Sequence, residues 1–176
     1  DLEILACEAM EKYGYIPRGT TNKIKKKAKF KVKEIENIEK VTKHDVIAFL
    51  TNVAKYVGDE SRFIHKGLTS SDILDSSFSI QLNQSSGYIL DGLEKLNKSL
   101  LKISKKHKNT LCIGRSHGIH AEVTTFGLKM LGYFEENKRN IKRLKSSIDQ
   151  IKTIQMSGPV GNYSNIDPKI EKYVAQ

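Results

Sequence analysis

The feature that most constrains the fold is a long stretch without proline, from Thr69 to about His107. It contains only two glycines, and its apolar residues recur near the 3.6-residue period of an α-helix. A helix of that length is about 60 Å long at 1.5 Å per residue. The apolar positions are Ile73, Leu74, Phe78, Leu82, Ile89, Leu93, Leu96, Leu100 and Ile103.

A second long helix is predicted from about Val123 to Ile154. Along it, positions alternate spacings of three and four, which is typical of left-handed helix packing, and all of them except Asn137 are apolar: Phe134, Asn137, Ile141, Leu144, Ile148 and Ile151. Neither helix can bury its stripe within 176 residues, so we expect helices of other subunits to cover them. Because only three prolines occur as well, we predict an all-α fold.

Shorter helices precede these two. One begins near Leu2 and ends before Gly14, another spans Asp45–Val57, and a lysine-rich stretch between them reads as solvated faces of short helices. We expect residues 1–68 to form a small N-terminal helical domain and 69–176 the first part of a central long-helix bundle. The chain opens within a helix and stops near the start of another, so we expect it to be part of a longer protein.

Charge narrows the classes of partner. Thirty Lys and Arg residues against twenty Asp and Glu give a formal charge of +10, which favours nucleic acid, an acidic membrane or an anionic metabolite. No apolar run approaches the length of about 18 residues that a membrane-spanning helix needs. The two cysteines, Cys7 and Cys112, have neither a disulfide framework nor metal-site spacing, and they fit a reducing, cytoplasmic compartment.

The first candidate site opens the first long helix. Thr69, followed three residues later by Asp72, has the form of a capping box. Thr69 and Ser70 also place hydroxyls beside free backbone N–H groups at a positive helix end, where a carboxylate or phosphate can bind. Capping alone is the simpler interpretation, and the residues by themselves leave both open.

The second candidate is the connection between the long helices, 111–122, which we expect to be a loop. His117 and His120 could serve acid–base catalysis or structural hydrogen bonds, and no Cys, Asp or Glu pattern completes a metal site with them. A hydrolase is excluded because there is no Gly-x-Ser-x-Gly elbow and no strand to carry one. Weaker candidates are the stretch 43–45 at a helix start and the glycine-containing segment 156–162, while His107 reads as solvated surface.

Four stretches together resemble the adenylosuccinate lyases of the fumarase/aspartase superfamily: KHDVIAF, FIHKGLTSSDILD, GRSHGIHAEVTTFG and MSGPVGN. The Gly-Ile-His-Ala continuation after His117 distinguishes this family from fumarases and argininosuccinate lyases. The resemblance implies β-elimination of fumarate from adenylosuccinate, giving AMP, and from the succinylated aminoimidazole carboxamide ribotide of purine biosynthesis. It implies no cofactor and no metal.

Residue roles follow from the same resemblance. His117 would be the general acid with Ser116 beside it, and Thr69 and Ser70 would hold the carboxylates of the succinyl group or fumarate. Contacts to substrate, or orientation of the acid, would come from Lys43, His44 and Asp45, with His65 also lining the pocket. Lys43 stands where the family usually has arginine and Ser116 where it usually has threonine; Lys43 keeps the charge but loses bidentate geometry.

The family forms homotetramers with active sites shared between subunits, and its serine base lies in a loop that these residues do not include. We therefore expect the chain alone to be inactive. Two alternatives remain: another fumarate-releasing lyase, such as an argininosuccinate lyase, and a non-catalytic basic helical scaffold that binds nucleic acid. Histidines gathered in loops and few aromatic residues count against the latter, so we expect neither a nucleic-acid nor a membrane partner.

Overall fold

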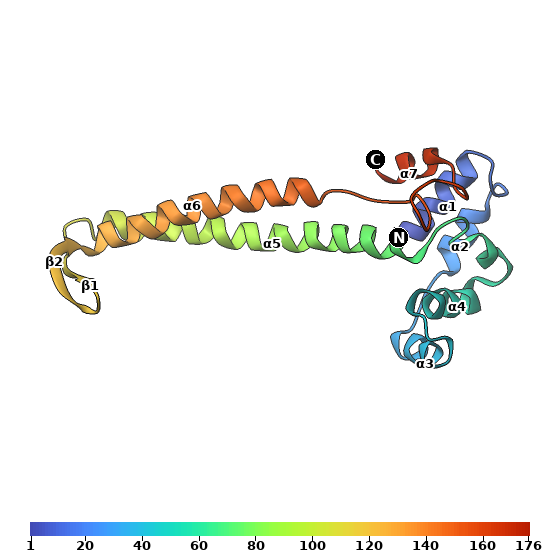
Figure 1. Cartoon of the computed structure of the whole chain (residues 1–176), viewed down its shortest axis with the longest axis horizontal. Helices are drawn as coiled ribbons and strands as arrows, with labels where there is room; N and C mark the ends of the chain where they lie inside the picture. Colours follow the sequence, from blue (N-terminus) through green and yellow to red (C-terminus); the bar gives the residue numbers. More distant parts are fainter. The chain divides into compact units, whose positions relative to one another are not determined.

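The computed structural model describes residues 1–176 and is dominated by helices (Figure 1). The prediction of an all-α fold is confirmed, with a single two-stranded sheet added. None of the helices combines the length and apolar character needed to cross a bilayer. In chain order the elements are α1 (Leu2–Lys12), α2 (Thr20–Lys27), α3 (Val32–Thr42), α4 (Asp45–Val57), the 3-10 helix η1 (Gly58–Phe63), α5 (Ser70–Lys106), β1 (Leu111–Ser116), β2 (Ile119–Thr125), α6 (Phe126–Ile151) and α7 (Pro168–Val174).

The chain forms two compact units. The first comprises residues 1–79 and 153–176, and the second comprises residues 80–152. The change from one unit to the other falls within α5. The domain boundary expected after residue 68 stays a prediction.

The first unit holds the hydrophobic core. Apolar side chains from α1, α2, α4 and α7 pack together with residues of the C-terminal segment, and α1 lies beside α7 (Figure 1). Five residues of α1 are buried in this core. The core residues are Leu2, Ala6, Cys7, Ala9, Met10, Ile16, Ile24, Val53, Val57, Met156, Ile166 and Ile170.

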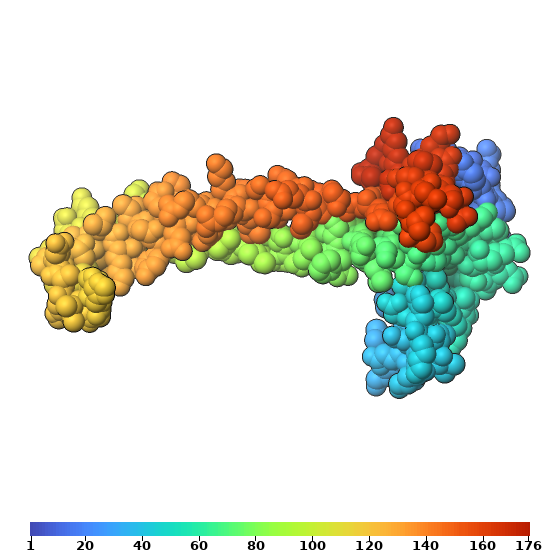
Figure 2. All heavy atoms as spheres, in the orientation of Figure 1, coloured from blue at the N-terminus to red at the C-terminus, as the bar shows by residue number.

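The second unit pairs the C-terminal part of α5 with α6, which lie side by side along their length (Figures 1 and 2). The predicted stripe of α6 is the less exposed face of that helix. All buried hydrophobic side chains of the chain lie in the first unit, whereas the buried side chains here are the polar Ser86, Ser104 and Asn137. Asn137 donates hydrogen bonds to the carbonyl oxygen of Leu93 at 2.9 Å and to Asn97 Oδ1 at 3.2 Å. This unit therefore lacks an apolar core of its own.

The connection between the long helices is a β-hairpin, so the predicted loop, and the statement that no strand occurs, were wrong. Strands β1 and β2 pair antiparallel, with Ser116 opposite Ile119. The two residues between them have positive φ, 51° at His117 and 78° at Gly118, as a type I′ turn requires. Because the Thr125 hydroxyl accepts the N–H of Leu128 at 3.1 Å, α6 begins at Phe126 rather than near Val123.

His107 is half-buried, which corrects its interpretation as solvated surface. Its Nδ1 lies 3.2 Å from Thr110 Oγ1, and its ring packs edge-on against Phe126 with the centroids 5.4 Å apart. The end of α5 and the start of α6 meet here so closely that a Cβ on Gly127 would lie 2.5 Å from the carbonyl oxygen of Ser104. His107 thus closes the helical hairpin of the second unit.

Candidate active site

Asp72 organises the start of α5. Its side chain is fully buried, and Oδ2 accepts the N–H of Thr69 at 2.9 Å. This is one of the two hydrogen bonds of a capping box, the one from the acidic side chain back to the first residue, and it confirms that part of the prediction. The same carboxylate accepts the backbone N–H groups of Ser157 and Gly158, each at 3.1 Å. Charge-assisted hydrogen bonds of this kind compensate for the burial of the carboxylate. The Thr-Ser-Ser-Asp stretch and the Ser-Gly-Pro stretch, separate in the sequence, are thereby joined.

The expected anion site at this helix end is altered by that arrangement. The N–H of Thr69 is occupied by Asp72 and is not free for a ligand. The Thr69 hydroxyl makes no hydrogen bond with a protein group, and Ser70 Oγ lies 3.5 Å from His44 Nε2. Two hydroxyls and an imidazole are therefore among the groups that this end of α5 offers to an anion.

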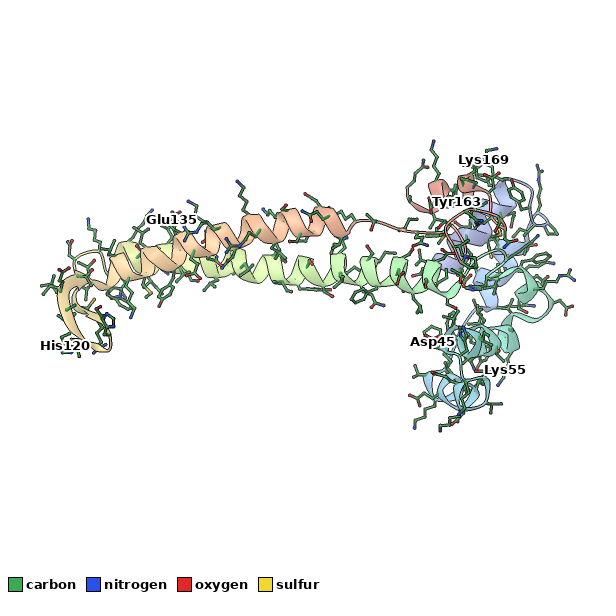
Figure 3. The ribbon with its side chains drawn as sticks, in the orientation of Figure 1. Asp45, Lys55, His120, Glu135, Tyr163 and Lys169 are labelled. Atoms are coloured by element: carbon green, nitrogen blue, oxygen red, sulfur yellow. The ribbon has the colours of Figure 1, made fainter.

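His44 links the 43–45 stretch to α5. As N-cap of α4, its Nδ1 lies 3.3 Å from the backbone N of Ile47, and it also lies 3.3 Å from Asp45 Oδ1. When Nδ1 accepts the N–H of Ile47, Nε2 carries the proton and can donate it to Ser70. Lys43 is exposed with a φ of 53° at the end of α3, and Asp45 opens α4 (Figure 3).

His65 occupies a turn between η1 and α5, in the left-handed region with a φ of 63°. Such a conformation costs a non-glycine residue about 1–2 kcal/mol, so surrounding contacts must hold it. Glu3 of α1 provides them: its Oε2 accepts the N–H of His65 at 2.9 Å and its Oε1 lies 2.7 Å from Nδ1. Both side chains are largely buried, 18% exposed for His65 and 12% for Glu3.

Ser116 and His117 lie at the turn of the β-hairpin. Both are exposed, and neither side chain forms a hydrogen bond within the chain. His120, on β2 opposite Arg115, is also exposed (Figure 3). A cavity of about 620 Å³ lies in the hairpin and the start of α6, lined among others by Cys112, Arg115 and Lys129. No group of three or more His, Cys, Asp or Glu side chains in the chain is placed to hold a metal ion.

The predicted site residues divide between the two units. The second unit carries Ser116 and His117, which adjoin in one turn, and the first carries the rest: Lys43, His44, Asp45, His65, Thr69 and Ser70. Within the first unit the structure brings His44 and Ser70 together. The hydrogen bonds of the His65 ring and N–H go to Glu3 and not to another predicted residue.

Two residues at these sites escaped the sequence interpretation. Glu3 precedes Cys7 by one helical turn on the buried face of α1, and an acidic residue at such a position signals a buried partner. Asp72 was recognised as a helix cap only, although its bonds to Ser157 and Gly158 span more than eighty residues. Nothing local in the sequence marks that second role.

The chain matches a known protein family along almost its whole length. The profile of the lyase family matches residues 2–176. The chain belongs to this family. The lyase chain is 49% identical over all of its 176 residues to an adenylosuccinate lyase of Synechocystis sp., and 41% identical over 172 residues to one of Thermotoga maritima. It spans 41% and 40% of the lengths of these relatives.

A solved structure gives the same fold. The fumarate lyase from Mesorhizobium sp. superposes on 99% of the lyase chain with a TM-score of 0.92, and the chain covers 43% of that protein. Only 20% of the residues are identical. The two proteins therefore share a fold.

Proposed function

We propose that this lyase chain belongs to an adenylosuccinate lyase, which eliminates fumarate from adenylosuccinate to give AMP. The succinylated aminoimidazole carboxamide ribotide of purine biosynthesis would be its other substrate. The observation that carries the proposal is the 49% identity to an adenylosuccinate lyase along the whole chain. The Gly-Ile-His-Ala continuation of the 111–122 stretch favours this substrate class over argininosuccinate.

His117 would protonate the leaving nitrogen. Its place in the hairpin turn supports this role, because both ring nitrogens are free of protein partners and can meet a substrate. Ser116 offers its hydroxyl from the adjacent position. No metal or cofactor is needed for a β-elimination in which one group removes a proton and another supplies one.

Residues of the first unit would bind the substrate's anionic groups. The Thr69 and Ser70 hydroxyls would hold the carboxylates of the succinyl group at the positive end of α5. His44, 3.5 Å from Ser70 Oγ, can donate to the same group, and the exposed Lys43 adds a positive charge. Asp45 and His65 would complete the pocket by contacting substrate or orienting the acid.

We further propose a homotetramer with active sites shared between subunits. Exposed apolar side chains of the second unit support this assembly. The fully buried side chains of this unit are polar, so its apolar side chains need a partner subunit to cover them. Those exposed side chains include Tyr88, Ile89, Leu96, Leu128 and Tyr133. Cys7 and Cys112 are free thiols, which fits a protein of the reducing cytoplasm. The proposed partner is the small-molecule nucleotide substrate, rather than nucleic acid or a membrane.

The proposal is tested by an ultraviolet assay on the complete product of the gene that encodes this chain. Adenylosuccinate should be converted to AMP and fumarate, whereas argininosuccinate should be left unchanged. If fumarate were released from argininosuccinate but not from adenylosuccinate, the protein would be an argininosuccinate lyase instead. Tight, salt-sensitive binding of DNA or RNA without any fumarate release would favour the basic scaffold instead.

A further inference from the structure

Glu3 contacts His65 at two places, whereas a simple surface ion pair involves the two side chains only. One carboxylate holds both the backbone N–H of His65, at 2.9 Å from Oε2, and ring atom Nδ1, at 2.7 Å from Oε1. Two contacts to the main chain and the ring fix the position of the residue and the orientation of its imidazole together. The opposite ring nitrogen, Nε2, makes no hydrogen bond with a protein group.

Glu3 lies on a helix that contacts the 63–65 segment. It lies on the buried face of α1, and His65 is its only ionic partner. One turn further along the same face, the Cys7 thiol donates to the carbonyl oxygen of Phe63 at 3.6 Å, so α1 contacts the 63–65 segment twice. By contrast, Glu8 on the same helix forms an ion pair with Lys25 at 3.6 Å, with side chains 30% and 63% exposed.

A carboxylate oxygen only accepts hydrogen bonds, so the contact to Glu3 requires a proton on Nδ1 of His65. In neutral imidazole, Nε2 is then left as an unprotonated acceptor that faces away from Glu3. We propose that Glu3 is a positioning residue of this enzyme: it fixes the tautomer of His65 and presents Nε2 to the substrate as a hydrogen-bond acceptor. For the substrate, this proposal rests on the function proposed above.

The substitution Glu3→Gln distinguishes this role from one in which Glu3 only holds the backbone of His65 in place. In Glu3→Gln the side chain keeps one oxygen and gains an NH₂ group, and the backbone N–H of His65 must retain the oxygen because it can only donate. The NH₂ group then faces Nδ1, which becomes an acceptor, and the ring proton moves to Nε2. An anchoring role alone would leave the tautomer unchanged.

The test is a long-range ¹H–¹⁵N correlation spectrum of the complete gene product with ¹⁵N-labelled histidine, at a pH of about 8.5 where ordinary imidazoles are neutral. The His65 signals are assigned by their loss in His65→Asn. We expect the Nδ1–H tautomer in the unsubstituted chain and in the control Glu8→Gln, and mainly the Nε2–H tautomer in Glu3→Gln. An unchanged tautomer in Glu3→Gln, with the fold intact by circular dichroism, overturns the proposal.

Kinetics of the complete gene product form the second arm. Glu3→Gln should lower kcat/KM about ten- to a hundredfold, the usual scale for a misplaced group, and should add almost nothing in a His65→Ala background. Additive losses would overturn action through His65. If the unsubstituted protein releases no fumarate, the proposed function fails, while the spectra still decide whether Glu3 fixes the tautomer.

Discussion

Asp72 accepts the backbone N–H of Ser157 at 3.1 Å, although 85 residues separate the two in the sequence. With its further bonds to Thr69 and Gly158, this buried carboxylate joins the start of α5 to the segment that follows α6. The position of the Thr69 and Ser70 hydroxyls therefore depends on a contact that is made late in the chain. Substitution of Asp72 should affect stability as well as the site.

Asp72→Asn should destabilise the chain by about 2–4 kcal/mol, because the amide replaces one accepting oxygen by an NH₂ group that opposes backbone N–H donors. Urea unfolding of the complete gene product measures the change in the free energy of unfolding. Asp75→Asn, at an exposed position of the same helix, serves as the control. Equal urea midpoints for the two variants would contradict the role assigned to Asp72.

Cys7 should be nearly inert toward thiol reagents. Burial, together with the charges of Glu3, Glu11 and Glu8, raises the pKa of Cys7 to about 12, so little thiolate forms at neutral pH. At pH 8 we expect disulfide reagents to modify the half-buried Cys112 at least about a hundredfold faster than Cys7. A Cys112→Ser variant isolates the slow reaction, and rapid modification of its single thiol in the folded state would contradict the burial.

The same shift makes stability depend on pH. An unfolded thiol ionises near pH 8.5, whereas Cys7 in the folded chain keeps its proton until about pH 12. The folded state therefore binds the extra proton, and stability falls as the pH rises through this interval. Between pH 8 and 10 the free energy of unfolding should drop by about 1–2 kcal/mol more than in Cys7→Ala. Parallel pH profiles for the two proteins would contradict this assignment.

Local sequence patterns predicted the long helices, but not the hairpin or the contacts between distant segments. The long helices were predicted within a few residues because a periodic apolar pattern reports its own helix, as at Ile141 and Leu144 on α6. The hairpin was missed because His117 and Gly118 form an I′ turn in which His replaces the more usual Asn or Asp. The bonds of Asp72 to Ser157 and of Glu3 to His65 depend on packing that no local pattern contains.

Thr69→Ala should raise the KM for adenylosuccinate about tenfold or more while changing kcat less, because it removes a hydroxyl proposed to bind a carboxylate. Thr69→Ser keeps the hydroxyl and should behave almost as the unsubstituted protein. Thr51→Ala on α4, whose hydroxyl bonds to its own helix, controls for the loss of a threonine. Steady-state kinetics of the complete gene product decide the matter, and an unchanged KM in Thr69→Ala would remove Thr69 from the binding site.

His117→Ala should lower kcat by roughly two to four orders of magnitude, the usual contribution of a general acid. His120→Ala is the matched control, since that residue belongs to the same hairpin and is also exposed. We expect its kcat to stay near the unsubstituted value. A large loss in His120→Ala with near-normal turnover in His117→Ala would move the acid to the other histidine.

Subunit complementation is the sharpest test of the proposal that hairpin residues and first-unit residues of different copies serve one elimination reaction. His117→Ala and Ser70→Ala forms of the complete gene product are mixed, unfolded and refolded together, and fumarate release is assayed at a low substrate concentration where each form alone is nearly inactive. If active sites are shared between subunits, a one-to-one mixture should regain about a quarter of the normal fumarate release. Mixtures that assemble into tetramers yet stay as inactive as their components would contradict the account.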